Sequence, residues 1–92
     1  MERYNARKVD DLRRIVLHGD LRRKLGLKEG SKVALTVIDS IVVVQRTDSD
    51  GCEVSDLGMI TIPADIRQKM SWVDGSDVAA YHTDSLLILK TA

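Results

Sequence analysis

The chain has 92 residues, the length of one small domain, and 43% of them are hydrophobic, which is enough for an aliphatic core. It contains no apolar run of about 18 residues, so we expect no membrane span, and its first residues lack the apolar core of a secretion signal. The single cysteine, Cys52, excludes an internal disulfide and fits a reducing cytoplasm, and the carboxylates of Asp50 and Glu53 should raise the pKa of its thiol.

The net charge of zero hides a division along the chain. Residues 1–47 carry eleven Lys or Arg and six Asp or Glu, whereas residues 48–92 carry three and eight. A net charge of +5 followed by one of −5 favours a basic working face on the first half over a general affinity for polyanions. Drift of surface charge without a role is the alternative explanation.

Two segments of the chain repeat each other at an offset of 45 positions without a gap. Val9 to Val33 reads VDDLRRIVLHGDLRRKLGLKEGSKV, and Val54 to Val78 reads VSDLGMITIPADIRQKMSWVDGSDV, which we interpret as an internal duplication. Each half lies near the limit of about 40 residues below which chains seldom fold alone, so the halves should share one core. We expect a single domain over 1–92, with repeats at about 7–46 and 53–91 and a polar linker over 47–52.

In the first half, Val9 and Leu12 would be the apolar anchors of a first strand. Asp20 suits the first turn of a helix, and Gly26 can end that helix because glycine readily takes a left-handed conformation. The unbroken β-branched run over 41–44 predicts a strand that is covered on both faces. The expected elements are frayed residues over 1–6, strands over 6–12 and 14–18, a helix over 20–25, a glycine turn over 28–31, and strands over 32–38 and 41–44.

The second half copies this layout, with Pro63 expected at the first helical position and Trp72 expected in the core. Each half is therefore β-β-α-β-β. Two such halves closing on each other predict a mostly β fold with two short helices, a pseudo-two-fold β-barrel without exposed strand edges. The expected elements are strands over 53–57 and 59–62, a helix over 63–70, and strands over 77–83 and 86–89.

The segments Lys8 to Val33 and Leu57 to Met70 resemble the AbrB/SpoVT family of small DNA-binding proteins, which includes the antitoxin MazE. The first looks like the family signature V-D-E-L-G-R-I-V-I-P-x-E-L-R-R-x-L-G-I, whereas the second keeps its glycine and I-P step but little basic content. Family members usually carry one such unit and dimerise into a swapped-hairpin barrel, so the resemblance implies a fused pseudo-dimer. The related double-psi and RIFT barrels, which are also built from two such units, are alternatives for the strand threading.

In that family, arginines on the first strands and on the short helix contact DNA, which implies the same role for the matching residues here. Arg13 replaces a glycine of the signature and adds charge, whereas Met59 and Gln68 replace basic residues in the second half. Three cations on one helical turn repel one another, an arrangement that stability alone would not favour. The predicted DNA-binding residues are Arg7, Lys8, Arg13, Arg14, Arg22, Arg23, Lys24 and Arg67.

No nucleophile–base set or glycine-rich phosphate loop occurs in the sequence, and neither His18 nor His82 stands at metal-ligand spacing from a Cys or a carboxylate. We therefore expect no catalytic residue, metal or cofactor. The leading hypothesis is a cytoplasmic transcriptional regulator that binds double-stranded DNA and forms a homo-oligomer, a dimer of pseudo-dimers, on a palindromic operator. The alternative is an antitoxin-like or other protein-interaction module with weak or no DNA binding, whose acidic second half docks a basic partner.

Overall fold

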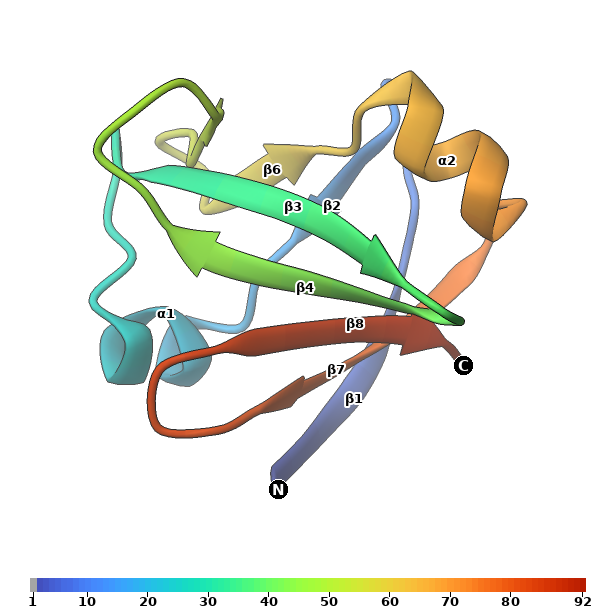
Figure 1. The fold of residues 1–92 in the computed structure, drawn as a ribbon. Coiled ribbons are helices and arrows are strands. Elements are labelled where there is room, and N and C mark those ends of the chain that lie inside the picture. Colours follow the sequence, from blue (N-terminus) through green and yellow to red (C-terminus); the bar gives the residue numbers. More distant parts are fainter. Residues whose placement is uncertain (1) are drawn as a thin grey trace.

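The computed structural model describes residues 2–92, with side chains described from Arg7 onward. Within this part of the chain, two seven-residue helices lie among eight short strands (Figure 1). In chain order the elements are β1 (Glu2–Lys8), β2 (Arg14–Val16), α1 (Gly19–Leu25), β3 (Lys32–Ile38), β4 (Ile41–Arg46), β5 (Cys52–Glu53), β6 (Met59–Thr61), α2 (Ala64–Met70), β7 (Asp77–His82) and β8 (Leu87–Thr91).

Six of the strands form one curled antiparallel sheet in the order β1-β7-β8-β4-β3-β5, and β2 pairs separately with β6. The curled sheet is a half-barrel, with α1 and α2 at opposite ends of the molecule (Figure 1). Closure into a hydrogen-bonded barrel, as expected from the sequence, does not occur, because β1 and β5 end the sheet instead of pairing with it on both sides. After each of these strands the chain turns away and forms the β2–β6 ribbon.

Hydrogen bonds between strands join the two halves of the chain at four places: β1–β7, β3–β5, β2–β6 and β4–β8. When residue numbers are shifted by 45 to the equivalent residues of the other half, the β1–β7 pairing becomes the β3–β5 pairing. The same shift exchanges the two strands of the β2–β6 pairing, and likewise those of the β4–β8 pairing, so each of these pairings is symmetric by itself. The halves therefore interlock about an internal two-fold relation. Matching Cα partners are Lys8↔Asp77 with Glu53↔Lys32, while Ile15↔Ile60 and Val43↔Ile88 join equivalent residues.

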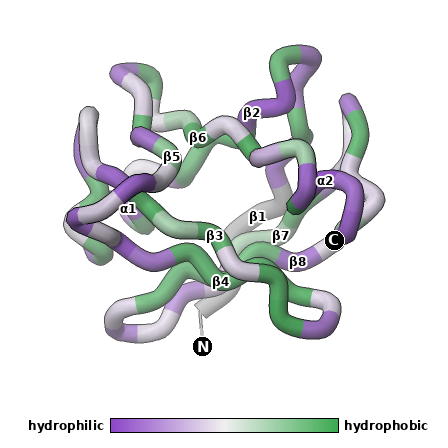
Figure 2. Tube along the Cα trace, turned by 45° about the horizontal axis from the view of Figure 1, so that its top comes forward, coloured by the Kyte–Doolittle hydropathy of each residue, from purple (hydrophilic) through white to green (hydrophobic). Residues whose placement is uncertain are grey.

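The core is a single cluster of aliphatic side chains that both halves supply, together with Trp72, which is 3% exposed as expected. Each helix contributes one buried residue, Leu21 in α1 and Ile66 in α2. Hydrophobic residues follow the strands, whereas hydrophilic residues gather on the helices and connecting loops (Figure 2). Burial of aliphatic surface between the halves is the main force that holds them together.

The first strand differs from the sequence prediction. β1 begins at Glu2 rather than after a frayed segment and ends at Lys8, while Met1 lies outside the described residues. Val9 is buried as expected, but Leu12 is 59% exposed because it lies in a turn instead of a strand. The equivalent Leu57 is 66% exposed, since β5 is only two residues long and leads into the same kind of turn.

Several boundaries in the middle of the chain agree with the sequence. β3 has the predicted bounds, and α1 ends at Gly26, which adopts the left-handed conformation with φ of 67°. Pro63 precedes α2 as its N-cap and is not its first helical residue. The prediction that β4 is covered on both faces is wrong for its outer face, where Ile41 and Val43 stay partly exposed. The buried residues of both helices and of the β2–β6 ribbon pack only on the inner face of the sheet.

Candidate functional site

A basic depression lies between α1, the loop that follows it and the end of β4. It consists of two adjoining hollows of about 440 and 390 Å³ that share Lys28, Glu29 and Arg46 in their walls. We call this surface the α1 groove. Its charged wall residues are the five cations Arg22, Arg23, Lys28, Lys32 and Arg46 and the two acids Glu29 and Asp48.

Local backbone geometry creates this groove. After the left-handed turn at Gly26, the N–H of Leu27 donates to Arg22 O at 2.8 Å, which buries Leu27 and leaves Lys28 exposed. A Cβ added to Gly26 would lie 3.1 Å from the Arg46 guanidinium, so the glycine lets Arg46 approach the end of α1. The Ser31 hydroxyl then accepts the Lys28 N–H at 3.0 Å and fixes the loop.

Arg22 ties the groove to the second half of the chain. Its Nε donates to Leu17 O at 3.3 Å, and its guanidinium lies directly over Gly58. A Cβ at Gly58 would lie 2.7 Å from Arg22 Cζ, a distance that real structures do not tolerate. Arg22 therefore stabilises the packing between the two halves as well as lining the groove, so its substitution would alter stability and ligand contacts together.

The other groove cations differ in how they are paired. Arg23 forms an exposed ion pair with Asp20, and such surface pairs contribute only about 0–1 kcal/mol. Among the described residues, no carboxylate forms an ion pair with Lys28, Lys32 or Arg46, and all three side chains are exposed. These three cations are consequently available to an anionic ligand at low cost.

The remaining predicted residues do not join this groove. Arg13 and Arg67 line a separate depression of about 160 Å³ near α2, together with Trp72, Asp11 and Asp74. Because α1 and α2 lie at opposite ends of the molecule, Arg13 and Arg67 are separated from Arg22 and Arg23 of the α1 groove (Figure 1). The others are Arg7, exposed near the end of β1, Lys8, bonded to Asp77 at 2.9 Å, Arg14, bonded to Asp10 at 2.9 Å, and Lys24, exposed on α1.

Lys28, Lys32 and Arg46 are groove residues that the sequence prediction missed. They come from a loop, the start of β3 and the end of β4. Their proximity depends on the β3–β4 register, in which Val33 is opposite Arg46 and thus places Lys32 beside it. The +5 charge of the first half was the one sequence signal that could have included them.

The turn after β1 contains the titratable group whose environment is best defined. Asp10 Oδ1 accepts the N–H groups of Arg14 at 2.7 Å and Leu12 at 3.0 Å. The Arg14 backbone N–H is the main reason why the pKa of Asp10 lies below its ordinary value of 3.8, and the Arg14 guanidinium lowers it further. These bonds keep the turn rigid and hold the Arg14 side chain back from ligands.

Cys52 is partly buried, and burial is the first cause of its raised pKa. The direction was expected, but the carboxylate that contributes is Asp65 of α2 and not the sequence neighbours Asp50 and Glu53. Within the described residues, no three His, Cys, Asp or Glu side chains group as a metal site, and neither helix is long and apolar enough to cross a bilayer. Comparison of the chain with protein-family models, curated proteins and solved structures finds no match.

Proposed function

We propose that this chain is a DNA-binding transcriptional regulator of AbrB type and that the α1 groove contacts the phosphate backbone of duplex DNA. The carrying observation is the gathering of five cations around two adjoining open hollows, three of them without an ion-pair partner among the described residues. Arginine and lysine on such a surface neutralise phosphates and release condensed counterions. Arginine can also bond in a bidentate manner to phosphate or to a guanine edge.

The interlocked strands support the same proposal. A swapped-hairpin barrel of AbrB type pairs strands of one unit with strands of another, and in this chain four strand pairings run between the two halves. Arg22 and Arg23, which match the helix arginines of the family signature, lie in the wall of the groove. Two chains, each presenting one such groove, would together read a palindromic operator.

The proposal predicts that removing groove cations weakens duplex binding and its salt dependence. In Lys28→Val/Arg46→Thr, each new residue is the one at the equivalent position of the second half, Val73 or Thr91. Because this variant would neutralise two fewer phosphates, the slope of log affinity against log salt should become less steep by about 1.8. Titration of a fluorescent duplex at several salt concentrations measures both the affinity and the slope.

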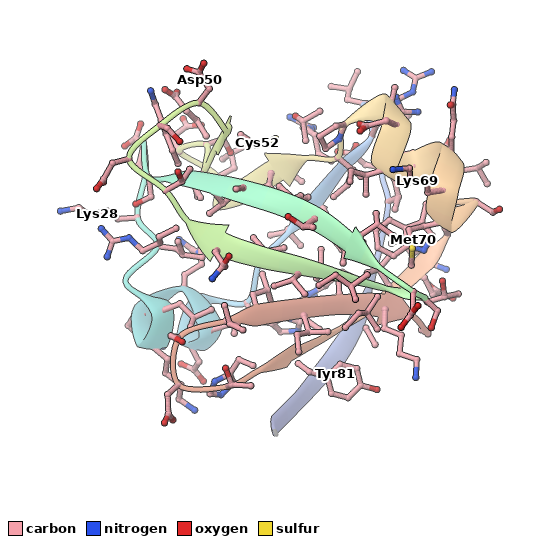
Figure 3. All side chains as sticks on the ribbon, viewed as in Figure 1. Lys28, Asp50, Cys52, Lys69, Met70 and Tyr81 are labelled. Carbon is pink, nitrogen blue, oxygen red and sulfur yellow. The ribbon has the colours of Figure 1, made fainter. Side chains whose placement is uncertain are left out.

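The matched control is Lys69→Gln/Lys90→Gln, which removes two charges outside the groove. Figure 3 shows Lys69 on α2, on the far side of the molecule from Lys28, and Lys90 lies in β8. The control should retain the wild-type slope. Equal losses of affinity in the two variants would mean that net charge alone governs binding, and absence of duplex binding by the wild-type chain would refute the proposed function.

A further inference from the structure

The internal two-fold relation gives the α1 groove a counterpart near α2 whose charge can be compared position by position. In the α1 groove, six equivalent positions hold five cations and one acid, a net charge of +4; near α2 they hold one cation and two acids, a net charge of −1. The equivalent pairs are Arg22/Arg67, Arg23/Gln68, Lys28/Val73, Glu29/Asp74, Lys32/Asp77 and Arg46/Thr91.

The backbone of the two grooves is nevertheless the same. Trp72 N–H donates to Arg67 O at 2.9 Å, as Leu27 N–H donates to Arg22 O at 2.8 Å. Ser76 Oγ accepts the Val73 N–H at 2.8 Å, which repeats the serine bond that fixes the loop after α1. The loops after the two helices thus share their backbone hydrogen bonds, and the two surfaces differ in the side chains, and in the charge, that these loops carry.

Carboxylates balance the cations that remain near α2. Lys8 bonds to Asp77 at 2.9 Å, and the depression that holds Arg13 and Arg67 also holds Asp11 and Asp74. The equivalents of Asp11 and Asp74 near α1 are Asp56 and Glu29. Glu29 lines the α1 groove with Arg22, so acids are present on both sides. The surplus of positive charge near α1 comes from the cations that have no cationic equivalent near α2, namely Arg23, Lys28, Lys32 and Arg46. A phosphate backbone approaching α2 would therefore meet a surface with no net attraction.

We propose that one chain holds duplex DNA by the α1 groove alone and keeps its α2 counterpart off the phosphate backbone. This inference rests on the proposed function. A single chain then covers a half-site in one fixed orientation, although its backbone is close to two-fold symmetric. Symmetric reading of a palindrome consequently requires a second copy of the chain and cannot be performed by the second half of the first.

Reciprocal variants test this one-sidedness. Arg23→Gln/Lys28→Val gives the α1 groove the residues of its counterpart, and Gln68→Arg/Val73→Lys does the reverse; all four positions are exposed, so the core is left intact. The probe is a duplex selected for wild-type binding, held in excess so that one chain binds each duplex. Hydroxyl-radical footprinting, which reports cleavage at the deoxyribose, maps the protected tracts of the sugar–phosphate backbone, and salt titration gives the slope.

The wild-type chain should protect one tract of phosphates, and Arg23→Gln/Lys28→Val should reduce affinity at least about tenfold. Gln68→Arg/Val73→Lys should add a second protected tract and steepen the slope by up to about 1.8. Two symmetry-related tracts with a single wild-type chain would overturn one-sidedness while leaving the proposed function standing. A wild-type chain that binds no duplex would overturn both.

Discussion

Asp10 and Ser55 occupy equivalent positions in the two halves, and each fixes a turn by accepting backbone hydrogen bonds, one with a carboxylate and the other with a hydroxyl. Each accepts hydrogen bonds from the N–H groups two and four residues further along the chain; for Ser55 these belong to Leu57 and Met59, both at 3.2 Å. The turn therefore needs an oxygen acceptor and not a negative charge. Only the aspartate version adds the ion pair to Arg14 and a dependence on pH.

We expect Asp10→Ser to lower stability at neutral pH and to have little effect in acid. The pKa of Asp10 is lowered in the folded state, so its carboxylate stabilises the fold above the ordinary value of 3.8 and loses this effect as the pH falls through the folded value. Urea unfolding at a series of pH values measures the difference between the variant and the wild type. A difference that is constant from neutral to acid pH would show that the charge has no role.

The two helices also differ between the halves in the residue that follows their last turn. α1 and α2 have the same length and both end in the left-handed conformation, but the residue there is Gly26 in one and Ser71, with φ of 58°, in the other. A side chain in this conformation is disfavoured by about 1 kcal/mol relative to glycine. The left-handed conformation at the end of α2 therefore carries a backbone strain that the end of α1 does not have.

Ser71→Gly should stabilise the protein by about 0.5–1 kcal/mol, because glycine adopts the left-handed conformation without the strain that a Cβ introduces. The reverse change, Gly26→Ser, should destabilise it, since a Cβ there also meets the Arg46 guanidinium at 3.1 Å. The midpoints of urea denaturation compare the two variants. A Ser71→Gly protein less stable than the wild type would contradict this account of the helix end.

The elements with local signals were the ones that sequence could predict. Gly26 ends α1 by its own conformational preference, and β3 is an apolar segment rich in β-branched residues next to a glycine turn, so both were located correctly. β1 was not, because its partner β7 lies in the other half of the chain and leaves no trace near Glu2–Lys8. Leu12 was misplaced for a different reason, because its apolar character indicates burial while the local Asp10 turn exposes it.

For the candidate site too, the residues with a local sequence signal were predicted and those brought together by the fold were not. Arg22 and Arg23 were predicted because they share a helical turn that matches a family signature. Lys28, Lys32 and Arg46 belong to three segments that only the strand register brings together. Arg13 was predicted to bind DNA together with the helix arginines, whereas in the fold it lines the depression near α2, because the turn before β2 packs against the opposite half.

At the scale of the whole molecule, the halves depend on each other for four of the six strand pairings among the described residues. Within one half, the large sheet retains only the β3–β4 or the β7–β8 hairpin. An isolated hairpin is marginal in water, and the buried cluster draws its residues from both halves. Neither half has the means to bury its own apolar surface alone.

A chain divided in the linker after Ser49 should therefore give two fragments that are unfolded as monomers and that fold when mixed. Because the two repeats are related by a two-fold axis, the first fragment could also fold by pairing with itself, and its structure would then depend on concentration. Circular dichroism and light scattering over a dilution series separate these cases. A monomeric, folded fragment would contradict the interdependence of the halves.

The pairing of β1 with β7 also has a consequence for biosynthesis. A ribosome must add roughly 70 residues after β1 before β7 exists, which takes several seconds at about 5–20 residues per second. Throughout that interval the nascent N-terminal strand has no native neighbour in its sheet, and it is open to association with other chains. Slowed translation of the residues between β1 and β7 should thus increase aggregation of the newly made protein more than slowed translation of the residues that follow β7.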